Sequence, residues 1–113
     1  MTEPRFFLTG PTKGLPDENR PSFDEAYSTL LSKAILTPVA EYFTSVKKRF
    51  DLVMSSDGVV VLPAWGRDEQ ARAEVLLAVA LNKPIYAYYQ HRPEKLEQLS
   101  NVKIVTRAEI ING

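Results

Sequence analysis

The sequence predicts one α/β domain of the flavodoxin-like (Rossmann-like) class, a three-layer sandwich around a five-stranded parallel sheet of order 2-1-3-4-5. Strand-length apolar runs alternate with helix-length amphipathic segments, an alternation typical of parallel β-α units. The run Gly58–Leu62 is apolar without alternation, which indicates a central strand covered on both faces. The chain has 113 residues, too few for two adequate cores, so residues 1–113 are expected to form a single domain.

The N-terminal part begins with an apolar run, Arg5–Thr9, that predicts the first strand. The loop Gly10–Pro21 is rich in proline and glycine and is long for a compact domain, a feature often associated with function. Ser22 with Glu25 three residues later forms a capping-box pattern, which predicts a helix from Ser22 to about Lys33.

The rest of the chain repeats the alternation of strands and helices. In order, the expected elements are a strand Ile35–Thr37, a helix Val39–Val53, a strand Gly58–Leu62, a loop Pro63–Arg67, a helix from an Asp68 cap to about Leu81, a strand Pro84–Tyr88, a helix Pro93–Leu99 and a strand Val102–Val105.

The predicted topology also places the functional site. In such sheets, ligands bind beyond the carboxyl ends of the strands, at the point where the strand order reverses. Here that point lies between the first and third strands, beside the loops Gly10–Pro21 and Pro63–Arg67. These are also the two most unusual loops of the chain.

Composition excludes several classes of function. Lys+Arg and Asp+Glu are both 14, a balance that argues against a nucleic-acid or membrane-surface protein working by bulk charge. There is no cysteine and one histidine, so thiolate, disulfide and multi-histidine metal chemistry is excluded, and we expect no metal and no cofactor. The longest apolar run, Val75–Leu81, is too short to span a bilayer, and Met1–Pro4 carries no signal-peptide core. We therefore expect a cytoplasmic protein that uses carboxylates, hydroxyls, amides and backbone groups.

Glu74 is the most informative residue. Its spacing to Ala71 and Ala78 places a carboxylate on or beside the apolar stripe of the third helix. A buried carboxylate is costly unless it is paired, and such groups concentrate at active sites. Two interpretations remain open: Glu74 borders the stripe and pairs with a lysine or arginine, or it is a functional carboxylate.

Three aspartates are further candidates. Asp68 lies six residues before Glu74, a rise of roughly 9 Å along a helix, so the two carboxylates would touch different parts of one ligand. Asp68 is also a natural N-cap, and capping does not exclude ligand contact. Asp57 precedes a strand and is typical of a turn, whereas Asp51 lies in the preceding helix with its role open.

Other candidates surround the expected cleft. Trp65 is either a hydrophobic plug or a wall against a flat ligand. Gly10 and Gly14 permit a close backbone approach or a positive φ. Tyr89 and His91 follow the fourth strand, where they would line the cleft or a subunit interface.

Two blocks of the chain resemble the nucleoside 2-deoxyribosyltransferase-like superfamily, and most closely its small bacterial and phage branch. That branch opens with a strand, Ala-Gly-Pro-Met-Thr-Gly and Pro-x-x-Asn-x-Pro-x-Phe, which Phe7–Asp17, Asn19 and Pro21–Phe23 resemble. The second block of that branch consists of an apolar strand followed by Leu-Pro-Gly-Trp and Ser-x-Gly-Ala-Arg-x-Glu. It is similar to Ser56–Trp65 and Ala71–Glu74 of this chain.

The resemblance implies chemistry at the N-glycosidic bond of 2′-deoxynucleosides or nucleotides, by transfer or hydrolysis. Glu74 would be the nucleophile and Asp51 a second catalytic carboxylate, while Asp68 would hold the sugar 5′ end and favour a nucleoside over a nucleotide. The substrate-binding set implied in addition comprises Phe7, Gly10, Pro11, Gly14, Asp57 and Trp65. Members complete the site from a second subunit, which implies a homodimer or larger homo-oligomer with Tyr89 or His91 contributing.

Two departures from the pattern keep an alternative open. Phe7 lacks the hydroxyl of the tyrosine often found there, and Gln70 stands where the family has glycine. The alternative is a catalytically impaired nucleoside- or nucleotide-binding module, or a phage-type scaffold or interaction protein on the same fold.

Overall fold

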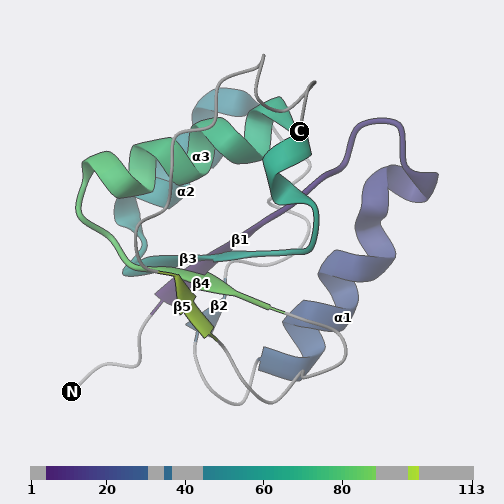
Figure 1. Ribbon diagram of the computed structural model, residues 1–113, viewed down its shortest axis with the longest axis horizontal. Coiled ribbons are helices and arrows are strands. Elements are labelled where there is room, and N and C mark those ends of the chain that lie inside the picture. Colours follow the sequence, from purple (N-terminus) through teal and green to yellow (C-terminus); the bar gives the residue numbers. More distant parts are fainter. Residues whose placement is uncertain (1–4, 31–34, 37–44, 89–96, 100–113) are drawn as a thin grey trace.

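The computed structural model describes residues 5–30, 35–36, 45–88 and 97–99 (Figure 1). Within these ranges the strands are β1 (Arg5–Thr9), β2 (Ile35–Leu36), β3 (Gly58–Val61), β4 (Ile85–Ala87) and β5 (Glu97–Leu99). The helices are α1 (Arg20–Leu30), α2 (Val46–Ser55) and α3 (Glu69–Ala80), with short 3₁₀ turns at Pro16–Asn19 and Trp65–Arg67.

One mixed sheet of order β2-β1-β3-β4-β5 organises the domain. β1, β3 and β4 form its parallel centre, with Phe7 opposite Val59 and Val60 opposite Tyr86. The two-residue β2 extends this centre in the parallel sense along β1. β5 runs antiparallel to β4 and pairs Leu99 with Ile85.

The predicted flavodoxin-like, five-stranded parallel sheet is therefore wrong. The structure is a small α/β domain whose parallel core consists of β1, β3 and β4, and β5 has the opposite direction. Only residues 88–96 separate β4 from β5. A parallel return requires a crossover of about a dozen residues or more, so this short connection favours an antiparallel strand.

Two predicted C-terminal elements are affected as well. Glu97–Leu99 is a strand, so the predicted helix Pro93–Leu99 is wrong over these residues. Its first part, and the predicted strand Val102–Val105, lie outside the described residues.

The start of α1 also differs from the prediction. The helix begins at Arg20, so Ser22 lies inside it and is not its cap. Asp17 and Asn19 have left-handed φ values of 50° and 64°, which turn the chain just before the helix. Pro21 then falls in the first turn, where a missing N–H leaves no intrahelical bond unmade.

α2 begins later than predicted. Ser45 caps it, because its hydroxyl accepts a hydrogen bond from the Lys48 backbone N–H at 3.2 Å. The helix covers Val46–Ser55, whereas the prediction was Val39–Val53, whose first residues lie outside the described part.

The helices cover both faces of the sheet. α2 and α3 pack side by side on one face and α1 lies on the other (Figure 1). All four residues of β3 are buried, as expected for a central strand covered on both sides. The core comprises apolar side chains of β1, β3 and the inward helix faces, among them Phe7, Phe23, Val53, Val60 and Val75.

Gly10 marks a tight contact between the ends of β1 and β3. A Cβ at this position would lie 2.7 Å from Leu62 Cβ. The backbone there is held by a 2.8 Å hydrogen bond from the Leu62 N–H to the Thr9 carbonyl, so the two strands have little freedom to separate.

We predict that Gly10→Ala lowers the free energy of unfolding by about 1–3 kcal/mol, the usual cost of overpacking. Gly66→Ala is the matched control, because a Cβ at Gly66 meets no atom within 4 Å. Urea denaturation of both variants measures the difference. Equal stability of the two variants would contradict the close contact.

Candidate functional site

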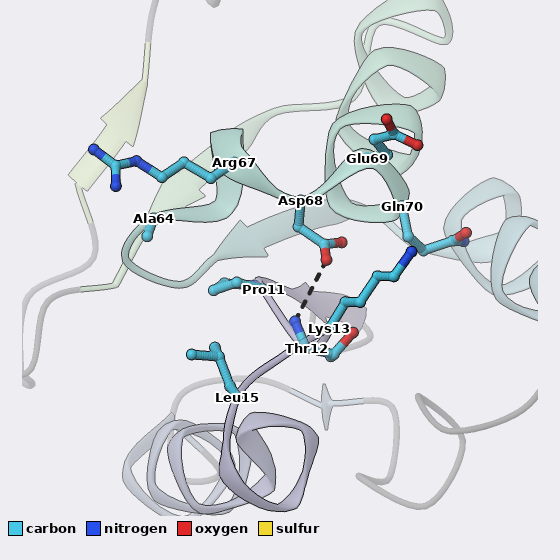
Figure 2. Close-up of a pocket in the computed structure, with 9 residues that line it drawn as sticks. All are labelled: Pro11, Thr12, Lys13, Leu15, Ala64, Arg67, Asp68, Glu69 and Gln70. Carbon is cyan, nitrogen blue, oxygen red and sulfur yellow. Dashed lines mark hydrogen bonds between the residues drawn. The ribbon is translucent and has the colours of Figure 1, made fainter. Parts of the chain in front are cut away.

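A cleft of about 790 Å³ lies beyond the carboxyl ends of β1 and β3, beside the first turn of α3 (Figure 2). Its wall combines the loop after β1 with the segment that leads into α3. The lining residues are Pro11, Thr12, Lys13, Leu15, Ala64, Arg67, Asp68, Glu69 and Gln70. The lining thus combines charged side chains of both signs with the apolar side chains of Pro11, Leu15 and Ala64.

Asp68 joins the two sides of this cleft. Its side chain caps α3 by accepting a 2.9 Å hydrogen bond from the Ala71 N–H. The other carboxylate oxygen accepts a long, 3.5 Å hydrogen bond from the Thr12 N–H, across the cleft in Figure 2. Capping and exposure to the cleft therefore coexist in one side chain.

Glu74 is completely buried, with 0% of its surface exposed. The Thr9 hydroxyl donates a 2.6 Å hydrogen bond to Oε1, and Nη2 of Arg49 donates a 2.8 Å bond to the same oxygen. Nε of Arg49 lies 2.7 Å from Oε2, an ion pair without the alignment of a hydrogen bond. The apolar stripe of α3 thus carries a carboxylate that is paired with an arginine.

Burial dominates the electrostatics of Glu74. Desolvation raises the pKa of its carboxyl above the ordinary value of 4.5. The charge of Arg49 opposes this shift, as do the hydrogen bonds from Thr9, Gln70 and Arg49. Glu74 is thus a carboxyl whose protonation state depends on its immediate neighbours.

Gln70 stands between Glu74 and the cleft. Its side chain lines the cleft, and its Nε2 donates a 2.9 Å hydrogen bond to Oε2 of Glu74 one turn along α3. Glu74 itself is absent from the cleft wall. The two carboxylates singled out on α3 therefore have different surroundings: Asp68 faces the cleft, and Glu74 lies behind Gln70.

The structure does not bring Asp51 and Asp57 to this site. Asp51 lies on the outer face of α2, where its exposed carboxylate pairs with Lys47 at 3.3 Å. Asp57 lies just before β3, at the opposite end of the strand from the cleft, and accepts a 2.8 Å hydrogen bond from the Arg5 N–H.

The other sequence-predicted residues divide between the cleft and the core. Pro11 lines the cleft, and Gly14 in the same loop has a φ of +80°. Gly10 contacts Leu62, as described above. Phe7 is fully buried and its ring lies 5.8 Å from Cζ of Arg49, whereas Trp65 packs partly buried against the core.

The remaining expectations concern Tyr89, His91, metal ligands and membrane-spanning helices. Tyr89 and His91 lie outside the described residues, so their contribution to a partner's site stays a prediction. Among the described residues, no three His, Cys, Asp or Glu side chains are grouped closely enough to hold a metal ion. None of the helices in these ranges has the length and apolar character needed to cross a membrane.

Arg49 and Thr9 are the residues that sequence reasoning missed. Arg49 precedes the buried Val53 by four residues, so it shares a helix face with a core side chain. The same argument that singled out Glu74 would have found it. Thr9 follows the buried apolar residues Phe6–Leu8 at the end of β1, where a hydroxyl needs a partner.

We predict a pH signature for the buried carboxyl. Because its pKa is raised in the folded state, Glu74 contributes stability that is fully present below pH 4.5 and is lost as the pH rises through the folded pKa. The free energy of unfolding of the wild type minus that of Glu74→Gln should therefore be larger at low pH than at neutral pH. Urea denaturation of both proteins across this range measures it, and a difference independent of pH would contradict the raised pKa.

Comparison with known proteins places the chain in a family. No curated protein and no solved structure matches it. Residues 4–87 match a family model described as a domain of unknown function, DUF4406. That match covers well over half of the 113 residues and includes the cleft, Arg49 and Glu74, and so the chain belongs to the DUF4406 family.

Proposed function

We propose that this chain binds a 2′-deoxynucleoside in the cleft and acts on its N-glycosidic bond, with Glu74 as nucleophile. The observation that carries the proposal is the 2.9 Å hydrogen bond from Gln70, a wall residue, to Glu74. It puts a carboxylate with an arginine partner one side chain behind a cleft of about 790 Å³. The resemblance to the nucleoside 2-deoxyribosyltransferase-like superfamily supplies the substrate class.

The reaction would proceed in two displacements. A carboxylate oxygen of Glu74 forms a bond to the anomeric carbon while the C–N bond breaks, and the electron pair leaves with the base, which takes up a proton. Water or a second base then attacks the anomeric carbon of the glycosyl ester and loses its proton to solvent, while the C–O bond breaks and Glu74 leaves as a carboxylate. Water gives hydrolysis, and a second base gives transfer.

Asp68 favours a ligand without a 5′-phosphate. Helix N-termini commonly bind phosphate through free backbone N–H groups, but here Asp68 already accepts a hydrogen bond from Ala71 N–H at the start of α3. Its negative charge would repel a phosphate and accept a hydrogen bond from a sugar hydroxyl.

Gln70 has to move before Glu74 can react. Glu74 is 0% exposed, so no substrate atom reaches it while the Gln70 amide occupies its position. A sugar in the cleft that competes for this amide would uncover the carboxylate.

Binding without cleavage is the second candidate function. The observation that favours it is the complete burial of Glu74 beneath three donor side chains, Thr9, Arg49 and Gln70. In this case the cleft would sense or sequester a nucleoside or nucleotide. Under either function, the balanced charge and absence of cysteine favour a cytoplasmic setting, and the resemblance favours a homo-oligomer.

We predict that Gln70→Ala releases free base from a 2′-deoxynucleoside about ten- to a hundredfold faster than the wild type. The gain follows from removing a hydrogen bond to a charged group, worth about 1.5–3 kcal/mol. Glu74→Gln should release none. Chromatography of a panel of deoxynucleosides measures release. If neither the wild type nor Gln70→Ala releases base, the chain is not an N-glycosidic enzyme.

We predict that Asp68→Asn reverses the preference for an unphosphorylated ligand. Asparagine is also a good N-cap, so the helix is retained while the charge is removed. The affinity for a deoxynucleoside should fall by about tenfold, and that for its 5′-monophosphate should rise. Calorimetric titration with both ligands measures this. Tighter binding of the monophosphate by the wild type would contradict the assigned role of Asp68.

A further inference from the structure

Arg49 gives α2 direct contact with the candidate nucleophile. Its side chain is 7% exposed and contacts both oxygens of Glu74: Nη2 lies 2.8 Å from Oε1 and Nε lies 2.7 Å from Oε2. A planar guanidinium that contacts both oxygens restricts the rotation of the carboxylate as well as its position. α2 therefore has a part in the site although no residue of α2 lines the cleft.

Two residues of β1 also contact this pair of side chains. The Phe7 ring lies 5.8 Å from Cζ of Arg49, within the range of a cation–π contact. Thr9, two residues later on the same strand, donates a 2.6 Å hydrogen bond to Glu74 Oε1. Phe7 thus contacts the arginine, and Thr9 supplies a hydroxyl to the carboxylate.

Among the described residues, Arg49 is the cation whose charge acts on the Glu74 carboxyl. Thr9 from β1 and Gln70 from α3 are neutral, and Arg49 from α2 is the charged side chain whose field lowers its pKa. Asp68, at the start of α3, turns toward Thr12 and the cleft. A buried carboxyl without a cation takes up a proton, and a protonated carboxyl is a poor nucleophile.

We infer that Arg49 is the positioning residue for Glu74: its guanidinium keeps the buried side chain as a carboxylate and orients it for attack. The inference rests on the proposed function, since it explains how a fully buried glutamate remains reactive. The carboxylate is held by Arg49 and Thr9, while Phe7 contacts the arginine through its ring.

The test combines an NMR titration with kinetics. The protein is labelled with ¹³C at the glutamate carboxyl carbons, and the Glu74 signal is identified by its loss in Glu74→Gln. Arg49→Met removes the positive charge, whereas Arg49→Lys keeps the charge but replaces the planar guanidinium with an ammonium group. Lys47→Met is the matched control, because it removes a cation from the same helix at a side chain that is 88% exposed.

We predict that Arg49→Met raises the titration midpoint of Glu74 by about one unit or more, a tenfold change in protonation, while Lys47→Met leaves it unchanged. The pH profile of base release should shift upward by the same amount. Arg49→Lys should keep the midpoint near that of the wild type, yet lower kcat with little change in KM. An unchanged midpoint in Arg49→Met, or equal shifts in both methionine variants, would overturn the inference.

Two further outcomes separate the inference from the proposed function. If the wild type releases no base, the proposed cleavage fails, while the titration still decides whether Arg49 controls the charge of Glu74. If Arg49→Met does not fold, Arg49→Lys carries the test through kinetics. Wild-type kcat in folded Arg49→Lys would then overturn the positioning role.

Discussion

The ion pair between Arg49 and Glu74 is the contact on which the rest of this domain depends. Both side chains are buried, and they join α2 to α3 above the end of β1, where Thr9 completes the contact. Such a pair adds little stability over an apolar one, but removing one partner costs about 3–5 kcal/mol, because a charge is left buried and unpaired. The pair therefore links α2 to α3 at one fixed point, and the loss of either partner is costly although the intact pair adds little stability.

Two carboxylates on one helix acquire different chemistry from their surroundings. Asp68 lies at the N-terminus of α3, where the backbone N–H groups of Ala71 and Thr12 donate hydrogen bonds to its carboxylate and where its side chain lines the cleft. Glu74 lies six residues further, under core side chains, where desolvation raises its pKa and Arg49 opposes that rise. Environments that separate the properties of two carboxyl groups are a common basis for assigning different roles in catalysis. Gln70 lies between them and connects the cleft to the buried group.

The site needs only part of the sheet. β1 contributes Thr9, β3 leads into the turn before α3, and their parallel pairing sets the two ends side by side. The antiparallel β5 is separated from β3 by β4, so it is not next to either strand that positions the cleft. That residues Glu97–Leu99 form an antiparallel strand and not the predicted helix therefore leaves the position of the cleft unaffected, since that position depends on where β1 and β3 end.

Residue patterns alone determined the local features: the strand Arg5–Thr9, the strand Gly58–Leu62 to within one residue of β3, the Asp68 cap, and a carboxylate at Glu74 on or beside an apolar stripe. These follow from periodicity and capping, which act over a few neighbouring residues. Only the tertiary structure decided that β5 is antiparallel, that Asp51 faces outward, and that Arg49 meets Glu74 across 25 positions of sequence. Such pairings depend on how helices and strands pack against each other, and no local spacing encodes which buried charge will find which partner.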